Sequence, residues 1–247
     1  MPPLVTDLQT HDFAAGALLL VDKPKGFTSF DVVNKLRYRL RKITGVKRIK
    51  VGHSGTLDPM ATGLLLIATG RATKALTELT GLPKAYTGTI TFGATTPSYD
   101  AETERTGDYP TAHLSELVLA NAIRDHLTGE IEQLPPIYSA IKVDGKRAYK
   151  AARAGQDIKL EPRRVRVDRF ELTRVAIPEA DFYVEVSKGT YVRSLAHDLG
   201  RLSGSGAYLS ALRRTRVGEF RIEDARPLAA IAEALEERLR REPPGER

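Results

Sequence analysis

The 247-residue chain contains no cysteine and no tryptophan, and only 6% of its residues are aromatic. Without cysteine, it cannot form disulfides or iron–sulfur clusters, bind zinc through thiolates or use a thiol nucleophile. This excludes the RNA uracil methyltransferases that depend on a cysteine. The five histidines show neither a His-x-x-x-His nor a Glu-x-x-His spacing, so no metal site is expected.

Long apolar runs and nucleotide-binding motifs are also absent from the sequence. The longest apolar stretches, 17–21 and 64–68, are too short to span a bilayer, and residues 1–13 lack the pattern of a signal peptide. There is no Walker sequence, and no Gly-x-Gly-x-x-Gly follows an expected strand, which disfavours ATP or dinucleotide chemistry. We therefore expect a cytoplasmic protein that has no membrane partner and binds no metal.

The positive charge of the chain is concentrated in one segment. The net charge is +7, and residues 35–50 (KLRYRLRKITGVKRIK) contain eight Lys or Arg and no acid, so the remainder carries a net charge of −1. Such a patch favours a polyanion because each contacted phosphate releases counterions. A solvated helix face fits the same pattern.

Hydrophobic periodicity predicts an α+β fold with a large mixed or mostly antiparallel sheet flanked by helices and loops. Residues 1–16 are expected to form a flexible arm, and 95–113 a long loop. We expect strands at 17–21, 64–68, 86–92, 164–175 and 182–187, and helices from Thr28 or Ser29 to about 42 and at 72–80, 115–128, 147–154, 191–203 and 227–241.

Two segments carry possible chemistry. In the run 52–63, a proline follows Asp58 and disfavours a helical conformation there, while the glycines let another chain approach. An isolated Asp-Pro is usually a surface turn, but this setting also suits a nucleophile. Segment 133–162 interleaves cations with tyrosines, which suits RNA with unstacked bases as well as an ordinary loop.

Four sequence blocks, in a fixed order, carry a family resemblance. They are DKPKGFTS (22–29), GHSGTLDPMATG (52–63), PPIYSAIKVDGKRAYKAARAG (135–155) and SKGTYVRSL (187–195), and LRRTRVGEF (212–220) closes the set. Together they resemble the TruB family of tRNA pseudouridine-55 synthases, from about Leu18 to Phe220. The resemblance implies a pseudouridine synthase fold, with a catalytic domain over 17–226 and an RNA-clamping insertion at 133–162.

The same resemblance implies a reaction and a partner. Uridine-55 in the T-arm of tRNA would be isomerised to pseudouridine without a cofactor, by a protein that we expect to be a monomer. Members of the family commonly carry a C-terminal PUA domain. Residues 227–247 read as one helix and a tail, so we expect no PUA domain here.

Matches to the family's motifs assign roles to individual residues. Asp58 is the expected nucleophile, attacking either C6 of the base or C1′ of the ribose. Arg193 matches the arginine that pairs with this carboxylate, and such a pair favours the ionised form. Tyr86 matches the tyrosine that stacks on the target uracil, where it is also a candidate for handling the C5 proton.

The remaining assignments concern substrate binding. His53 matches the residue that fills the gap left by the extruded base. Tyr191 and Leu212 match residues of the base pocket, although either side chain could be plain core, and Lys23 matches a residue beneath the site. We expect the RNA backbone to contact cations of the basic segment and of the insertion, namely Lys35, Arg37, Arg39, Arg41, Lys142, Lys146 and Arg147.

Three other functions fit parts of the pattern. A tRNA-folding chaperone would use the same surface without needing Asp58 or Arg193. A guide-dependent rRNA pseudouridine synthase of the dyskerin-like type shares the Asp58 block, but the missing extra domain and the lack of long basic tails disfavour it. An RNA N-glycosidase would need a second carboxylic acid paired with Asp58, and none is evident.

Overall fold

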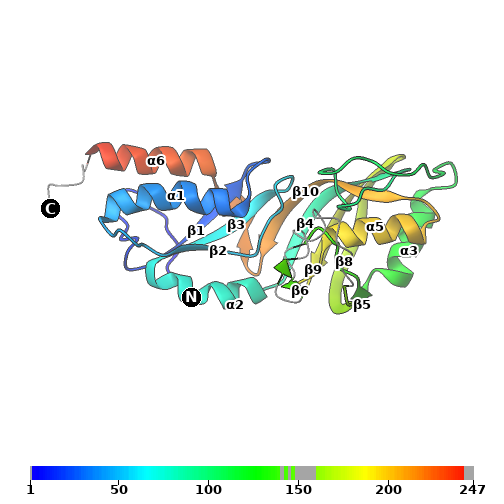
Figure 1. Cartoon of the computed structure of the whole chain (residues 1–247), viewed down its shortest axis with the longest axis horizontal. Helices are drawn as coiled ribbons and strands as arrows, with labels where there is room; N and C mark the ends of the chain where they lie inside the picture. The colour runs from blue at the N-terminus through cyan, green and yellow to red at the C-terminus, as the bar shows by residue number, and fades with distance from the viewer. Residues whose placement is uncertain (1, 140–141, 144–145, 148–159, 242–247) are drawn as a thin grey trace. The chain divides into compact units, whose positions relative to one another are not determined.

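The computed structural model describes residues 2–139, 142–143, 146–147 and 160–241. The chain divides into two compact units (Figure 1). The first unit combines residues 1–84 with 213–247, and the second comprises residues 85–212. This boundary falls inside the single catalytic domain that we expected over 17–226, and the C-terminal helix belongs to the first unit.

The first unit contains five whole strands, two long helices, one short helix and two 3-10 turns. Its strands are β1 (Ala17–Lys23), β2 (Val51–Ser54), β3 (Thr62–Thr69), β11 (Phe220–Arg221) and β12 (Arg226–Pro227). Its helices are α1 (Ser29–Thr44), α2 (Leu76–Gly81) and α6 (Leu228–Arg241), with 3-10 turns η1 (Gly70–Ala75) and η2 (Ile222–Asp224).

The apolar runs of β1 and β3 lie at the centre of the first unit because both of their faces are buried. The two strands are antiparallel, with Leu19 opposite Ile67. Figure 1 shows α1 and α6 side by side, and their apolar faces pack on one side of these strands. On the other side, Leu18 and Leu66 pack with Leu79 of α2. The apolar runs therefore form strands, as we predicted, and both runs are fully buried.

Helix α1 begins where the sequence predicts. Thr28 is its N-cap and accepts a hydrogen bond from the Asp31 amide, while the Asp31 carboxylate accepts one from the Thr28 amide. This reciprocal capping box satisfies two amides at the start of the helix. The helix ends at Gly45, whose φ of 67° is a conformation that glycine adopts without steric cost.

The second unit is built on an antiparallel ladder in which β9 (Glu179–Val186) pairs with β8 (Arg163–Ala176) and β8 pairs with β5 (Gly129–Gln133). Strand β10 (Ala207–Val217) contributes its first six residues to this unit and its last five to the first unit, where Arg213 pairs in parallel with Thr62 of β3. The other elements are β4 (Lys84–Phe92), β6 (Lys142–Val143), β7 (Lys146–Arg147), α3 (Glu116–His126) and α5 (Val192–Leu202).

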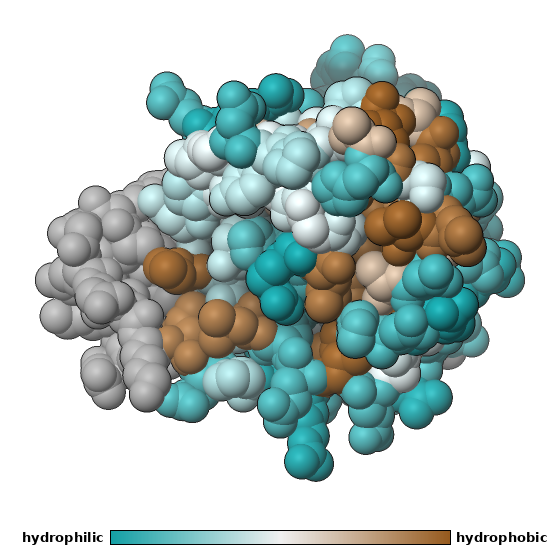
Figure 2. Space-filling model, turned by 90° about the vertical axis from the view of Figure 1, so that its right-hand side faces the viewer, coloured by the Kyte–Doolittle hydropathy of each residue, from teal (hydrophilic) through white to brown (hydrophobic). Residues whose placement is uncertain are grey.

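The large sheet contains ten strands with both parallel and antiparallel pairs, which confirms the predicted α+β class with a mixed sheet. The face of the molecule in Figure 2 mixes apolar patches with polar surface. Large exposed apolar side chains of the second unit are Tyr109, Leu117, Leu134 and Ile137.

Several local predictions differ from the structure. Strand β10 is not among the expected strands, and the helix expected over 72–80 begins as the 3-10 turn η1. Of the helix expected at 147–154, Arg147 lies in strand β7 and the rest lies outside the described residues. The N-terminal segment, expected as a flexible arm, contributes Leu8 and Phe13 to the buried core.

Candidate active site

Asp58 lies in the loop between β2 and β3 of the first unit and is partly exposed. Its carbonyl accepts a hydrogen bond of 3.1 Å from the Ala61 amide. With Pro59 as the second residue, this bond closes a four-residue turn of the kind that proline favours. A second turn supports it, because the Gly26 amide donates to the Pro59 carbonyl at 2.8 Å.

The residues before Asp58 are held by buried side chains. The Ser29 hydroxyl, on the first residue of α1, accepts from the Leu57 amide at 2.8 Å and donates to the Leu57 carbonyl at 3.2 Å. Arg214 is 1% exposed and donates to the carbonyls of Gly55 (3.1 Å) and Leu64 (2.7 Å). The loop is therefore fixed on both sides of the Asp58 backbone.

Lys23 is fully buried at the end of β1. Its ammonium group donates to the carbonyls of Pro24 (3.1 Å) and Phe27 (2.6 Å). These bonds shape the turn that presents Gly26 to Pro59. The predicted role of Lys23 beneath the active site stays a prediction.

His53 lies in β2 and is partly buried. Burial, together with the positive charge of Arg214, lowers the pKa of His53 below 6.5, although the Gly55 backbone opposes this shift. The neutral imidazole is thus favoured near neutral pH. An uncharged flat ring is suited to stacking against a base.

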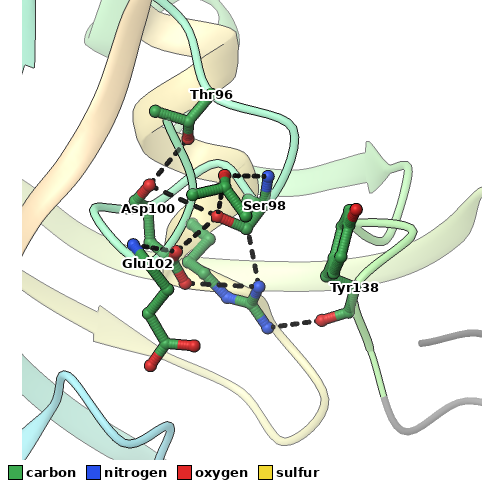
Figure 3. A network of polar contacts seen from close by, with 7 residues as sticks. Thr96, Ser98, Asp100, Glu102 and Tyr138 are labelled. Carbon is green, nitrogen blue, oxygen red and sulfur yellow. Dashed lines mark hydrogen bonds and ion pairs between the residues drawn. The ribbon is translucent and has the colours of Figure 1, made fainter. Parts of the chain in front are cut away.

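In the second unit, Arg193 is buried and lies in a polar network whose members Ser98, Asp100 and Tyr138 are labelled in Figure 3. Its Nη1 donates to the Ser98 carbonyl at 2.9 Å and lies 3.4 Å from Oδ2 of Asp100, and its Nη2 donates to the Tyr138 carbonyl at 3.0 Å. Arg193 is the second residue of α5, so these contacts tie the start of that helix to two loops.

The Asp100 carboxylate is itself held in place. Its Oδ1 accepts from the Ser98 hydroxyl (2.5 Å) and from the Glu102 amide (3.0 Å), and its backbone carbonyl accepts from the Thr96 hydroxyl (2.7 Å). Residues 95–113 are expected from the sequence to form a connecting loop, with no role for Asp100. The sequence Thr-Pro-Ser-Tyr-Asp (96–100) indicates a turn. No sequence pattern indicates that Asp100 contacts the distant Arg193.

Tyr191, the N-cap of α5, has its backbone fixed by a fully buried glutamine. Gln133 accepts from the Tyr191 amide at 2.7 Å and donates to the Tyr191 carbonyl at 3.0 Å. The guanidinium of Arg163 lies 4.5 Å from the centre of the Tyr191 ring, a cation–π distance. Gln133 is a second positioning residue that the sequence analysis did not identify.

Tyr86 and Leu212 lie on neighbouring strands of the second unit, β4 and β10, and both are buried. Bonds from Thr91 to Ser210 and from Ser210 to the Thr89 carbonyl join the two strands. The structure therefore brings together in one unit four of the predicted site residues, namely Tyr86, Tyr191, Arg193 and Leu212.

Two family models match consecutive parts of this chain. "TruB family pseudouridylate synthase (N terminal domain)" matches residues 41–192, more than half of the chain, and "tRNA pseudouridylate synthase B C-terminal domain" matches residues 193–242. The chain belongs to the TruB family. It is therefore a pseudouridine synthase, an RNA-modifying isomerase.

Relatives of this TruB-family chain are similar over nearly their whole length. A protein of Flavobacterium johnsoniae named tRNA pseudouridine synthase B is 50% identical over 92% of this chain and 99% of its own. A protein of the same name from Phocaeicola vulgatus is 47% identical over 92% of this chain and 96% of its own.

Solved structures support the same fold. The "Crystal Structure of a Cbf5-Nop10-Gar1 Complex" contains a chain with a TM-score of 0.68 and 29% identity. The match covers 94% of this chain and 58% of that chain, so the TruB-family chain spans less than two thirds of the solved one. These findings confirm the pseudouridine synthase fold expected from the sequence.

The predicted TruB-family residues divide between the two units. Asp58, His53 and Lys23 lie in the first, whereas the predicted partner of Asp58, Arg193, lies in the second. The pairing of Asp58 with Arg193 therefore stays a prediction.

The described ranges contain no cluster of three or more His, Cys, Asp or Glu suited to a metal, and no helix within them is long and apolar enough to cross a membrane.

The predicted cations of α1 differ in their surroundings. Arg41 is exposed, whereas Arg39 donates to the Ala232 carbonyl (3.2 Å) and forms an ion pair with Glu236 (3.0 Å), both in α6. Lys35 lies over the Phe27 ring, and Arg37 donates to the Val51 carbonyl at 3.1 Å. In the insertion, the backbone of Lys142 in β6 is opposite that of Arg147 in β7, and Lys146 is the first residue of β7.

Proposed function

We propose that this TruB-family enzyme converts uridine-55 in the T-arm of tRNA to pseudouridine, with Asp58 as the nucleophile. The observation that carries the proposal is the Asp58 loop. Hydrogen bonds with Ser29, Gly26 and Arg214 fix its backbone. A partly exposed carboxylate on a rigid turn is suited to attack, as in glycosidases.

The proposed reaction is a rearrangement with no change in oxidation state. Asp58 adds to C6 of the uracil or to C1′ of the ribose, and the N1–C1′ bond breaks. The base then turns and a C5–C1′ bond forms, after which C5 loses its proton, N1 carries a proton and the carboxylate is released. The atoms balance without a cofactor, and both points of attack are compatible with a carboxylate nucleophile.

The other site residues prepare the base for this step. Extruding a nucleotide from folded RNA costs a few kcal/mol, on the order of one or two stacking contacts. His53 would offset part of this cost by stacking where the base had been. Tyr86 would stack on the extruded uracil between Tyr191 and Leu212, and Arg193 would favour the ionised form of Asp58.

The RNA backbone would bind at a basic hollow in the first unit. Two adjoining pockets, of about 480 and 220 Å³, share Arg48, Ile49, Lys50 and Thr73. Their linings include no acidic side chain. The cations that line them are Arg37, Arg41, Lys47, Arg48, Lys50, Arg71 and Lys74. The surface proposed for RNA thus extends beyond the predicted 35–50 segment to Arg71 and Lys74, while Lys142, Lys146 and Arg147 would bind from the insertion.

A tritium-release assay tests the proposal. A tRNA transcript tritiated at uridine C5 is incubated with the purified protein, and released tritium is counted. We expect release with the wild type without added metal or nucleotide, and almost none with Asp58→Asn, which should still bind tRNA. Asp125→Asn, at an exposed position of α3, is the matched control and should be fully active.

The outcomes separate the parts of the proposal. Full activity of Asp58→Asn would refute the nucleophile assignment. Release from a transcript in which only uridine-55 is replaced by cytidine would refute the position. We also propose that the active form is a single chain and that it acts in the cytoplasm. A loss of activity on dilution that separates an oligomer into single chains would contradict the single-chain form.

A further inference from the structure

Tyr99 and His197 form a close aromatic stack in the second unit. Their ring centres are 3.9 Å apart, and the ring planes differ by 8°. Tyr99 is half-buried in the loop that follows β4, and His197 is half-buried in α5. The stack is therefore a contact between this loop and the helix that carries Arg193.

The backbone at Tyr99 has an unusual conformation. Its φ is 63°, and among the described residues it is the one non-glycine with a positive φ. An aromatic residue adopts this left-handed conformation only where its surroundings fix it. Asparagine or glycine would meet the backbone requirement with less strain. The side chain of Tyr99 must therefore contribute something that these smaller residues lack.

Both chain neighbours of Tyr99 contact the guanidinium of Arg193. Ser98 supplies the carbonyl and Asp100 the carboxylate that contact Nη1. His197 lies four residues after Arg193, so both side chains project from the same face of α5. Three consecutive loop residues thus contact two successive turns of one helix.

The other side of this loop is attached to β10. The Tyr99 carbonyl accepts from the Leu209 amide at 3.0 Å, and the Ala101 amide donates to the Leu209 carbonyl at 3.1 Å. These bonds fix the loop relative to the strand that carries Leu212. The Tyr99 ring fixes the same loop relative to α5.

We propose that Tyr99 is a positioning residue for Arg193. Its stack on His197 holds the loop at the distance from α5 at which Ser98 and Asp100 orient the guanidinium. Without the ring, Arg193 would keep its charge but lose its fixed orientation. This inference rests on the proposed role of Arg193 at the reacting centre.

Three single variants and one double variant test the proposal by tritium release under single- and multiple-turnover conditions. Tyr99→Asn tolerates the left-handed backbone but removes the ring, and His197→Ala removes the other half of the stack. We expect each to lower kcat about tenfold, with KM for tRNA unchanged, because a displaced group costs rate rather than binding. Tyr99→Phe keeps the ring and should restore nearly full kcat.

The decisive comparison is the double variant Tyr99→Asn with Asp100→Asn. If Tyr99 acts through the Arg193 network, replacing Tyr99 should lower kcat little further in a protein that already carries Asp100→Asn. Additive losses in kcat, or a change in KM alone, would overturn the proposal. So would wild-type kcat in either Tyr99→Asn or His197→Ala, and tRNA binding by each variant verifies that it is folded.

Failure of this inference is distinguishable from failure of the proposed function. An inactive Asp58→Asn beside a fully active Tyr99→Asn would leave the nucleophile assignment standing and refute only the positioning role.

Discussion

The guanidinium of Arg193 lies 3.4 Å from the carboxylate of Asp100, and their side chains are only 6% and 1% exposed. Burying two charges is favourable only when they are paired and further hydrogen-bonded. Here Arg193 also donates to two carbonyls, and Asp100 accepts from Ser98 and Glu102. The network therefore fixes the arginine before any substrate binds.

Replacing Asp100 by Asn should reduce both activity and stability. The substitution keeps the shape of the side chain but leaves the Arg193 charge without its carboxylate, which costs about 1–3 kcal/mol for a buried group. We expect kcat in the tritium assay to fall at least about tenfold, or about 1.4 kcal/mol. Asp108→Asn, exposed in the same long loop, is the control and should behave as the wild type. Equal activity of the two variants would contradict the role given to the network.

Removing the Ser29 hydroxyl should loosen the Asp58 loop. In Ser29→Ala, the buried Leu57 amide loses its acceptor, at a cost of about 1–3 kcal/mol. We expect a lower urea midpoint and a lower kcat, with tRNA affinity retained. Thr44→Ala is a matched control, because it removes a hydroxyl bond to Leu40 at the other end of α1. If Ser29→Ala lowers the urea midpoint but leaves kcat unchanged, the Asp58 loop does not need the Ser29 hydroxyl for activity.

The basic surface should divide into cations that bind RNA and one that binds α6. Arg41→Gln and Arg71→Gln each remove a cation from the hollow. Each should weaken tRNA binding and reduce the slope of log K against log salt by about 0.7–1. Arg39→Gln should leave that slope unchanged but lower the free energy of unfolding by up to about 1 kcal/mol, because it breaks the partly exposed pair with Glu236. Filter binding over a salt series distinguishes these results, and a reduced slope for Arg39→Gln would contradict the division.

Local signals account for the parts of the fold that the sequence predicts. The capping box at Thr28 and the apolar runs of β1 and β3 depend on neighbours along the chain, so α1 and both strands were found. Strand β10 was missed because Arg213 and Arg214 interrupt its apolar pattern. Arg214 is buried only because distant carbonyls, such as that of Leu64, accept its hydrogen bonds.

The same reasoning explains which candidate site residues can be predicted from the sequence. Asp58 can be predicted as a candidate because glycines and a proline surround it in the sequence and because the motif resembles that of a known family. Asp100 and Gln133 were missed because their importance depends on Arg193 and Tyr191, which lie far along the chain. Tertiary partners of this kind leave no periodic signal in a single sequence.

Stability should fall as the pH drops below 6.5, in part through His53. Its pKa is lowered in the folded protein, mainly by burial and then by Arg214, so below 6.5 the unfolded state binds more protons. The free energy of unfolding therefore decreases as the pH falls from 6.5 towards the folded pKa, and this contribution levels off below it. His197 acts in the same direction, because burial and Arg201 lower its pKa. His53→Gln removes only the first contribution, so its stability should fall less steeply than that of the wild type. Urea midpoints measured above and below pH 6.5 test this difference, and parallel curves for the two proteins would show that His53 does not titrate differently on folding.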